Sequence, residues 1–168
     1  HEAVATDTLY SNTPAFDSGS TVAQFFIGRS SMFRTARRLG SSDRSFANTL
    51  SDEIRKYGAM DKLVSDNAKA EISEKVKDIL RTFAINNWQS EPYKGNQNFA
   101  ERGWRDTKTK VNSLLNSSGA PAAAAWMLAL EYICFNQNHT AIDSLGGRTP
   151  IEWLLGYTPD ISVLLQFQ

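Results

Sequence analysis

The order of strand-like and helix-like segments is the feature that most constrains how this chain can fold. Three segments with strand character come first, and helical spacing of apolar residues begins after residue 43. Two more short strands then alternate with helices before the chain ends in helices. The predicted strands are 4–11, 21–28, 31–39, 62–66 and 84–90, and the predicted helices are 44–57, 69–83, 96–116, 122–138 and 150–155.

This order predicts an α/β fold, with a mixed sheet of about five strands and helices on both faces. The strand–helix–strand order over 31–66 predicts parallel pairing through a right-handed crossover. The segment 84–90 is expected at the sheet edge. The helix 122–138 is apolar nearly all round and is expected to be buried. A length of 168 residues suits one domain, 1–168.

Three acidic residues occupy positions where carboxylates could meet. Asp7 lies within the first strand and Asp66 at the end of the fourth, where α/β sheets place ligands. Glu101 lies in a helix, with 34 residues between it and Asp66. Carboxylate oxygens are the ligands that Mg²⁺ prefers, and paired metal ions can stabilise both the attacking and the leaving oxygen of a phosphoryl transfer. The three residues are therefore candidate metal ligands and catalytic residues.

The short contexts of these acids resemble the catalytic core of retroelement integrases, most closely the copia-type retrotransposon branch. The matching segments are Ser-Asp-Asn-Ala at 65–68, Pro-Tyr at 92–93, Asn-Phe at 98–99, Ala-Glu-Arg at 100–102 and the tail RTPIEWLLGYTPDISVLLQF at 148–167. Ala68 and Phe99 stand where the family has glycine. The resemblance implies an RNase H-like fold, and a core domain isolated from flanking zinc-binding and C-terminal regions.

The resemblance also implies a DNA integrase, a polynucleotidyl transferase that processes the element's DNA ends and joins the 3′ hydroxyl to target DNA. Asp7, Asp66 and Glu101 would hold Mg²⁺ or Mn²⁺, with two ions when DNA is bound. The implied partners are element-end DNA, target DNA and further copies of the chain, in a homodimer or higher oligomer. The implied location is the nucleus, with a cytoplasmic particle before entry.

Two other classes of function stay open. An RNase H-like nuclease or transposase would cut without joining, and a domesticated element could leave a catalytically silent DNA-binding or assembly domain. Considered one at a time, these acidic residues could also have structural roles without any part in catalysis. Asp66 before Asn67 can form a turn, and a helical glutamate near arginine and lysine can form a solvated ion pair.

Four residues are candidates for contacts to DNA. Lys108 and Arg105 share a helix face with Glu101, and the family has a DNA-contacting basic residue at the place of Lys108. Asn67 could orient Asp66 or contact DNA. Tyr93 could stack on a base or pack under its own loop.

Composition limits the other functions. The net charge is zero, which is unusual for a DNA-binding protein, although basic residues gather over 29–38 and 102–110. The single Cys134 rules out an internal disulfide and is expected to be a buried apolar residue. No apolar stretch is long enough to span a membrane. The two histidines lack a Cys/His cluster, so no zinc is expected in this segment.

Overall fold

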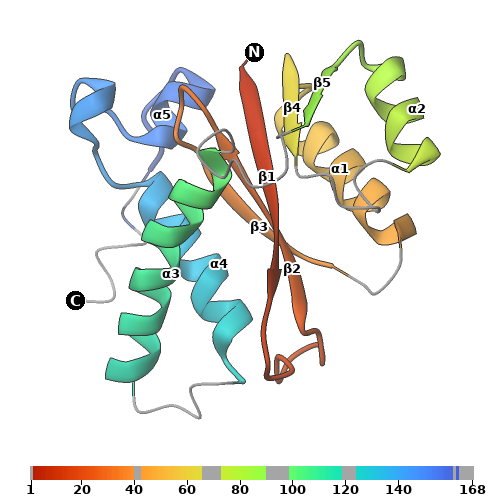
Figure 1. The fold of residues 1–168 in the computed structure, drawn as a ribbon. Coiled ribbons are helices and arrows are strands. Elements are labelled where there is room, and N and C mark those ends of the chain that lie inside the picture. The colour runs from red at the N-terminus through yellow and green to blue at the C-terminus, as the bar shows by residue number, and fades with distance from the viewer. Residues whose placement is uncertain are drawn as a thin grey trace.

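The computed structural model describes residues 2–39, 43–65, 73–89, 99–118, 124–160 and 162, without the side chains of residues 43 and 44. Its centre is a five-stranded sheet with the strand order β3-β2-β1-β4-β5 (Figure 1). β1 pairs antiparallel with β2 and parallel with β4. The strands are β1 (Ala3–Tyr10), β2 (Val22–Gly28), β3 (Arg34–Arg38), β4 (Lys62–Ser65) and β5 (Asn86–Gln89).

Helices cover both faces of this sheet. On one face lie α3 and α4, and on the other lie α1 and α2 (Figure 1). The helices are α1 (Asp43–Tyr57), α2 (Glu74–Thr82), α3 (Phe99–Ser117), α4 (Trp126–Asn138) and α5 (Pro150–Leu155), with a short 3-10 turn, η2 (Asp143–Leu145), before α5. The predicted α/β class, the mixed five-stranded sheet and the helices on both faces are confirmed.

Alternation along the strands divides the apolar residues between two cores. In β2, Phe25 and Ile27 face the core under α3 and α4, whereas Phe26 faces the core under α1 and α2. In β1, Ala5 and Leu9 belong to the first of these cores, and Val4 packs against the second. Successive strand side chains point to opposite faces, so a strand with apolar residues on both sides becomes buried in the sheet.

The predicted parallel pairing of the strands at 31–39 and 62–66 is wrong, because β3 and β4 are not neighbours in the sheet. β4 follows α1 and pairs in parallel with β1, whereas β3, which precedes α1, lies three places from β4 at the sheet edge. β5 pairs parallel with β4 and forms the other edge, as predicted for 84–90. This arrangement places the end of β4 beside the middle of β1.

The start of the third strand differs from the prediction for a physical reason, whereas the start of the last helix agrees with it. The third strand begins at Arg34 rather than at residue 31, because residues 29–31 turn and Met32 has a left-handed φ of 58°. The last helix begins at Pro150 as predicted, because Thr149 and Glu152 form a capping box at its start. Residues 69–72 of the predicted 69–83 helix lie outside the described residues.

The prediction that helix 122–138 is buried is wrong for one of its faces. Leu128, Tyr132 and Phe135 of α4 are 43%, 49% and 41% exposed. A helix in an outer layer of this helix–sheet–helix fold has one face against the sheet, so apolar composition alone does not bury the other. Cys134 does lie on the buried face, and its burial raises the pKa of the thiol to about 12. Among the described residues, no helix is long and apolar enough to cross a membrane.

Candidate active site

Asp7 lies on the sheet face that α3 and α4 cover. Its neighbours Thr6 and Thr8 point to the other face, where both bond to the buried side chain of Gln24 at 2.6 and 2.9 Å. Asp7 therefore shares its face with Ala5 and Leu9, as alternation predicts. Its side chain is half-buried and has interactions within the fold.

α3 is positioned over this part of β1 by contacts with β2. Phe25 is the cross-strand partner of Asp7, and its ring centroid lies 6.0 Å from that of Trp104. One residue earlier in α3, Gly103 lies against Ile27, and a Cβ at this glycine would come within 2.5 Å of Ile27 Cδ1. The first turns of α3 thus pass beside the level of Asp7.

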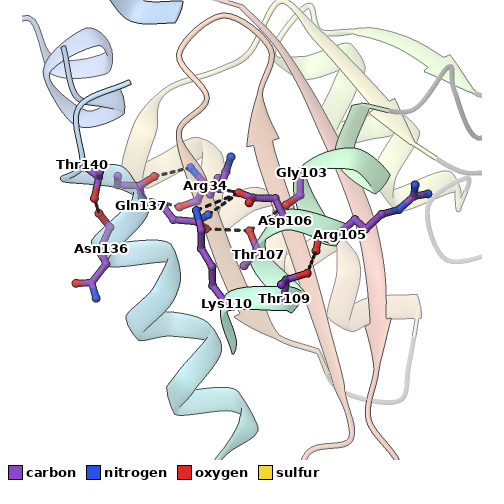
Figure 2. A network of polar contacts seen from close by, with 11 residues as sticks. Arg34, Gly103, Arg105, Asp106, Thr107, Thr109, Lys110, Asn136, Gln137 and Thr140 are labelled. Atoms are coloured by element: carbon purple, nitrogen blue, oxygen red, sulfur yellow. Dashed lines mark hydrogen bonds and ion pairs between the residues drawn. The ribbon is translucent and has the colours of Figure 1, made fainter. Parts of the chain in front are cut away.

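Glu101 lies on the flank of α3 that faces away from α4. Because α-helical residues advance about 100° each, Arg105 and Lys108 lie within about 40° of Glu101 around the axis, and Asp106 lies about 140° away. Asp106 accepts a hydrogen bond from Gln137 of α4. Figure 2 shows Arg105 pointing away from Asp106 and α4. Since α4 packs over β3, this other flank lies toward β1 and β4.

The carboxylate of Glu101 has a partner on its own helix. Arg105 donates a hydrogen bond of 2.9 Å to Glu101 Oε1, and both side chains are substantially exposed. Such an exposed pair contributes little to stability, about 0.3–0.5 kcal/mol. Arg105 therefore holds the carboxylate of Glu101 only weakly, and a metal ion could replace Arg105 as its partner.

The basic residues of the sequence divide into two groups in the structure. Three of the early arginines form ion pairs with acidic residues of the chain: Arg34 with Asp106, Arg37 with Glu53 and Arg38 with Asp17. Lys108 and Arg102 of α3 are exposed, on the outer side of the helix. Among the described residues, the exposed cations of α3, rather than the paired arginines of β3, are therefore available to an outside anion near Glu101.

Three of the predicted site residues, Asp66, Asn67 and Tyr93, lie outside the described residues. Within the part of the chain that the structure describes, no group of three or more acidic, histidine or cysteine side chains could hold a metal ion. Asp7 and Glu101 are the described members of the predicted triad. Their carboxylates lie on one side of the sheet, and oxygen donors of this kind fit Mg²⁺ or Mn²⁺.

Sequence reasoning missed a polar cluster that ties α3 to its surroundings. Arg34, Asp106 and Gln137 meet between β3, α3 and α4 (Figure 2). A signal was present, because Gln137 follows Leu130 and Ile133 on the buried stripe of α4. A polar residue at such a position requires a hydrogen-bond partner in the core.

Asp106 makes the contribution of this cluster to the stability of the fold depend on pH. Burial raises the pKa of Asp106, but the charges of Lys110 and Arg34 and their hydrogen bonds outweigh it, and the pKa lies below its usual value. The stabilisation is thus present above the unfolded-state pKa of about 3.9 and is lost as pH falls through the folded value.

We expect Asp106→Asn to lower the free energy of unfolding by about 1–2 kcal/mol at pH 7, less than for a fully buried pair because Asp106 is half-exposed. The difference from the unmodified chain should shrink below pH about 4. Urea denaturation at pH 7 and pH 3 measures it. Asp78→Asn, in an exposed pair with Arg81, is the control and should change stability by no more than about 0.5 kcal/mol. A difference that is equal at both pH values would contradict the charged role of Asp106.

The fold of this chain is similar to that of a solved structure. The catalytic core domain of BIV integrase aligns with 99% of this chain and 99% of its own, at a TM-score of 0.66 and 21% sequence identity. The chain has the RNase H-like fold of a retroviral integrase core. No protein-family model matches the chain, and no curated protein matches it.

Proposed function

We propose that this chain is an integrase catalytic core that joins DNA ends to target DNA by metal-dependent phosphoryl transfer. The observation that carries the proposal is the placement of Asp7 and Glu101. Asp7 lies on the sheet face that α3 and α4 cover, and Glu101 lies on the flank of α3 that is turned away from α4. An RNase H-like nuclease and a silent assembly domain remain the alternatives that the experiment below separates.

The register of the sheet supports Asp66 as the third carboxylate. Ala3 pairs with Lys62 and Ala5 with Val64, so paired residues of β1 and β4 are separated by 59 positions. Asp7 and Asp66 are separated by the same number of positions in the sequence. We infer that Asp66, just after the end of β4, shares its site with Asp7.

The proposed reaction has two steps, both on phosphodiesters. Water first cleaves a bond near the element's end, leaving a 3′ hydroxyl. That hydroxyl then attacks a target phosphate, forming a new phosphodiester and releasing a 3′ hydroxyl of the target strand. One or two Mg²⁺ or Mn²⁺ ions held by Asp7, Asp66 and Glu101 would supply charge neutralisation. Arg105 and Lys108, on the same flank of α3 as Glu101, would hold the DNA backbone in place.

A joining assay tests the proposal. A duplex that carries a labelled end is incubated with the chain, a supercoiled target and Mg²⁺ or Mn²⁺. Label transferred into the target supports an integrase. Shortened label without transfer indicates a nuclease, and an unchanged label in every metal indicates a silent domain.

Replacing Lys108 with alanine tests the DNA-binding flank. Lys108→Ala should weaken duplex binding at all sequences and reduce the slope of log affinity against log salt by about 1, because one phosphate contact is lost. Fluorescence anisotropy across a salt series measures both. Lys77→Ala, on α2 at the opposite face of the sheet, is the matched control and should leave the slope unchanged. Equal slopes in the two variants would remove Lys108 from the interface.

Further parts of the proposal concern partners and place. We propose that Asn67 and Tyr93 contact DNA near the site, and that the chain acts as a homodimer or higher oligomer because integration joins two ends. Its proposed place of action is the nucleus. Light scattering over a range of concentrations measures self-association, and a constant monomer mass would contradict it for this core.

A further inference from the structure

A partly buried polar cluster joins β3, α3 and α4 at one place. The Arg34 side chain is 7% exposed, and its Nη1 lies 3.0 Å from Asp106 Oδ2. Gln137 Nε2 donates to the same oxygen at 2.8 Å. Asn138 holds the backbone of Arg34 from both sides, accepting from its N–H at 2.8 Å and donating to its carbonyl at 2.7 Å. The backbone of Arg34 is therefore fixed to α4, and its guanidinium is bonded to α3.

Gln137 contacts two consecutive residues of α3. Its Nε2 donates to Asp106, and its Oε1 lies 2.9 Å from Thr107 Oγ1. Thr107 is fully buried, and its hydroxyl also lies 3.0 Å from the carbonyl of Gly103. Because consecutive residues point about 100° apart around a helix, an amide that bonds both of them fixes the rotation of the helix.

The apolar contacts of α3 do not fix that rotation equally well. Gly103 against Ile27 and Trp104 against Phe25 set how closely the helix approaches the sheet. Dispersion contacts are not directional, whereas hydrogen bonds weaken steeply away from their preferred angles. The polar cluster is thus the directional constraint on α3.

A small rotation of α3 would displace Glu101. The tip of a helical side chain lies about 5–6 Å from the axis, so a turn of about 10° moves it by about 1 Å. Misplacement of a catalytic group by that amount can slow a reaction about a hundredfold. We propose that Gln137 and Asp106 are positioning residues, which set the rotation of α3 and thereby the placement of Glu101. The inference rests on the proposed catalytic role of Glu101.

Gln137→Met is the sharpest test, because methionine has a similar length but cannot bond Asp106 and Thr107 as the amide does. We expect kcat for DNA joining to fall about tenfold to a hundredfold while KM for DNA stays unchanged, as for other residues that orient a metal ligand. Amide hydrogen exchange in residues 99–105 should become about tenfold faster, and this readout needs no activity. Added to Glu101→Gln, the substitution should cause no further loss of kcat.

Lys110→Met is the matched control. Lys110 also pairs with Asp106, at 3.4 Å, but on the exposed side of the cluster, so exchange and kcat should stay at their original values. A second pair of variants applies if Gln137→Met does not fold. Thr107→Val removes the hydroxyl and should slow joining, whereas Thr107→Ser keeps it and should restore the rate.

The outcomes separate the two proposals. Faster exchange in α3 together with no joining by the unmodified chain would show that Gln137 holds α3 in place, but it would reject the proposed function and with it the positioning of a catalytic Glu101. Normal joining by the unmodified chain, with kcat and exchange unaltered in Gln137→Met, would overturn the positioning role. A lower kcat with unaltered exchange would also overturn it, because Glu101 would then be affected by another route.

Discussion

Replacing Glu101 with glutamine is expected to lower metal-dependent DNA joining about a thousandfold. Glutamine keeps the size of the side chain but removes the negative charge that would hold a divalent cation opposite a phosphate, and electrostatic stabilisation of this kind is often the largest contribution to catalysis. The fold should survive, because the substitution weakens only the exposed pair with Arg105. Initial rates in the joining assay, together with a thermal melt, measure both effects.

Glu131→Gln is the control for this substitution. Glu131 is an exposed carboxylate on α4, so the change of charge is the same but lies away from the candidate site. Joining by this variant should stay within about twofold of the original rate, as expected for a surface substitution. Full joining by a folded Glu101→Gln variant would remove Glu101 from the catalytic site and leave the chain with the fold alone.

Replacing Gly103 with valine is expected to destabilise the fold by about 3 kcal/mol. A Cβ at this position would come within 2.5 Å of Ile27 Cδ1, and Ile27 is buried in the core under α3 and α4. Helix and sheet would have to separate, which places the cost at the upper end of that for overpacked cores. Urea denaturation at pH 7 measures the change in the free energy of unfolding.

A compensating substitution tests the cause. Ile27→Ala removes as many carbon atoms as Gly103→Val adds, and by itself should cost about 2–5 kcal/mol through the cavity that it leaves. The double variant should lose at least about 1 kcal/mol less unfolding free energy than the two single variants lose in sum, because the added valine side chain would fill the space that Ile27→Ala leaves. Additive effects would show that the close approach of α3 to β2 does not limit stability.

Local patterns predicted most elements of this fold. The β-branched residues of 4–11 and the apolar run of 21–28 predicted β1 and β2, and the capping residues Thr149 and Glu152 account for the start of α5. The exposed face of α4 was not predicted, because an apolar helix reads the same whether one or both of its sides are covered. The burial of Arg34 was not predicted either, since its partners Asp106 and Asn138 lie 72 and 104 residues away in the sequence.

The sequence by itself determined the α/β class, the order of the elements and the three candidate carboxylates, because these depend on periodicity and on short motifs within the chain. Only the tertiary structure decided that β4 pairs with β1, that Glu101 lies on the flank of α3 turned away from α4, and that three of the early arginines form ion pairs with acidic residues of the chain. These features depend on which distant segments pack together. That choice follows from burying apolar surface and pairing buried polar groups across the whole domain, which no local pattern records.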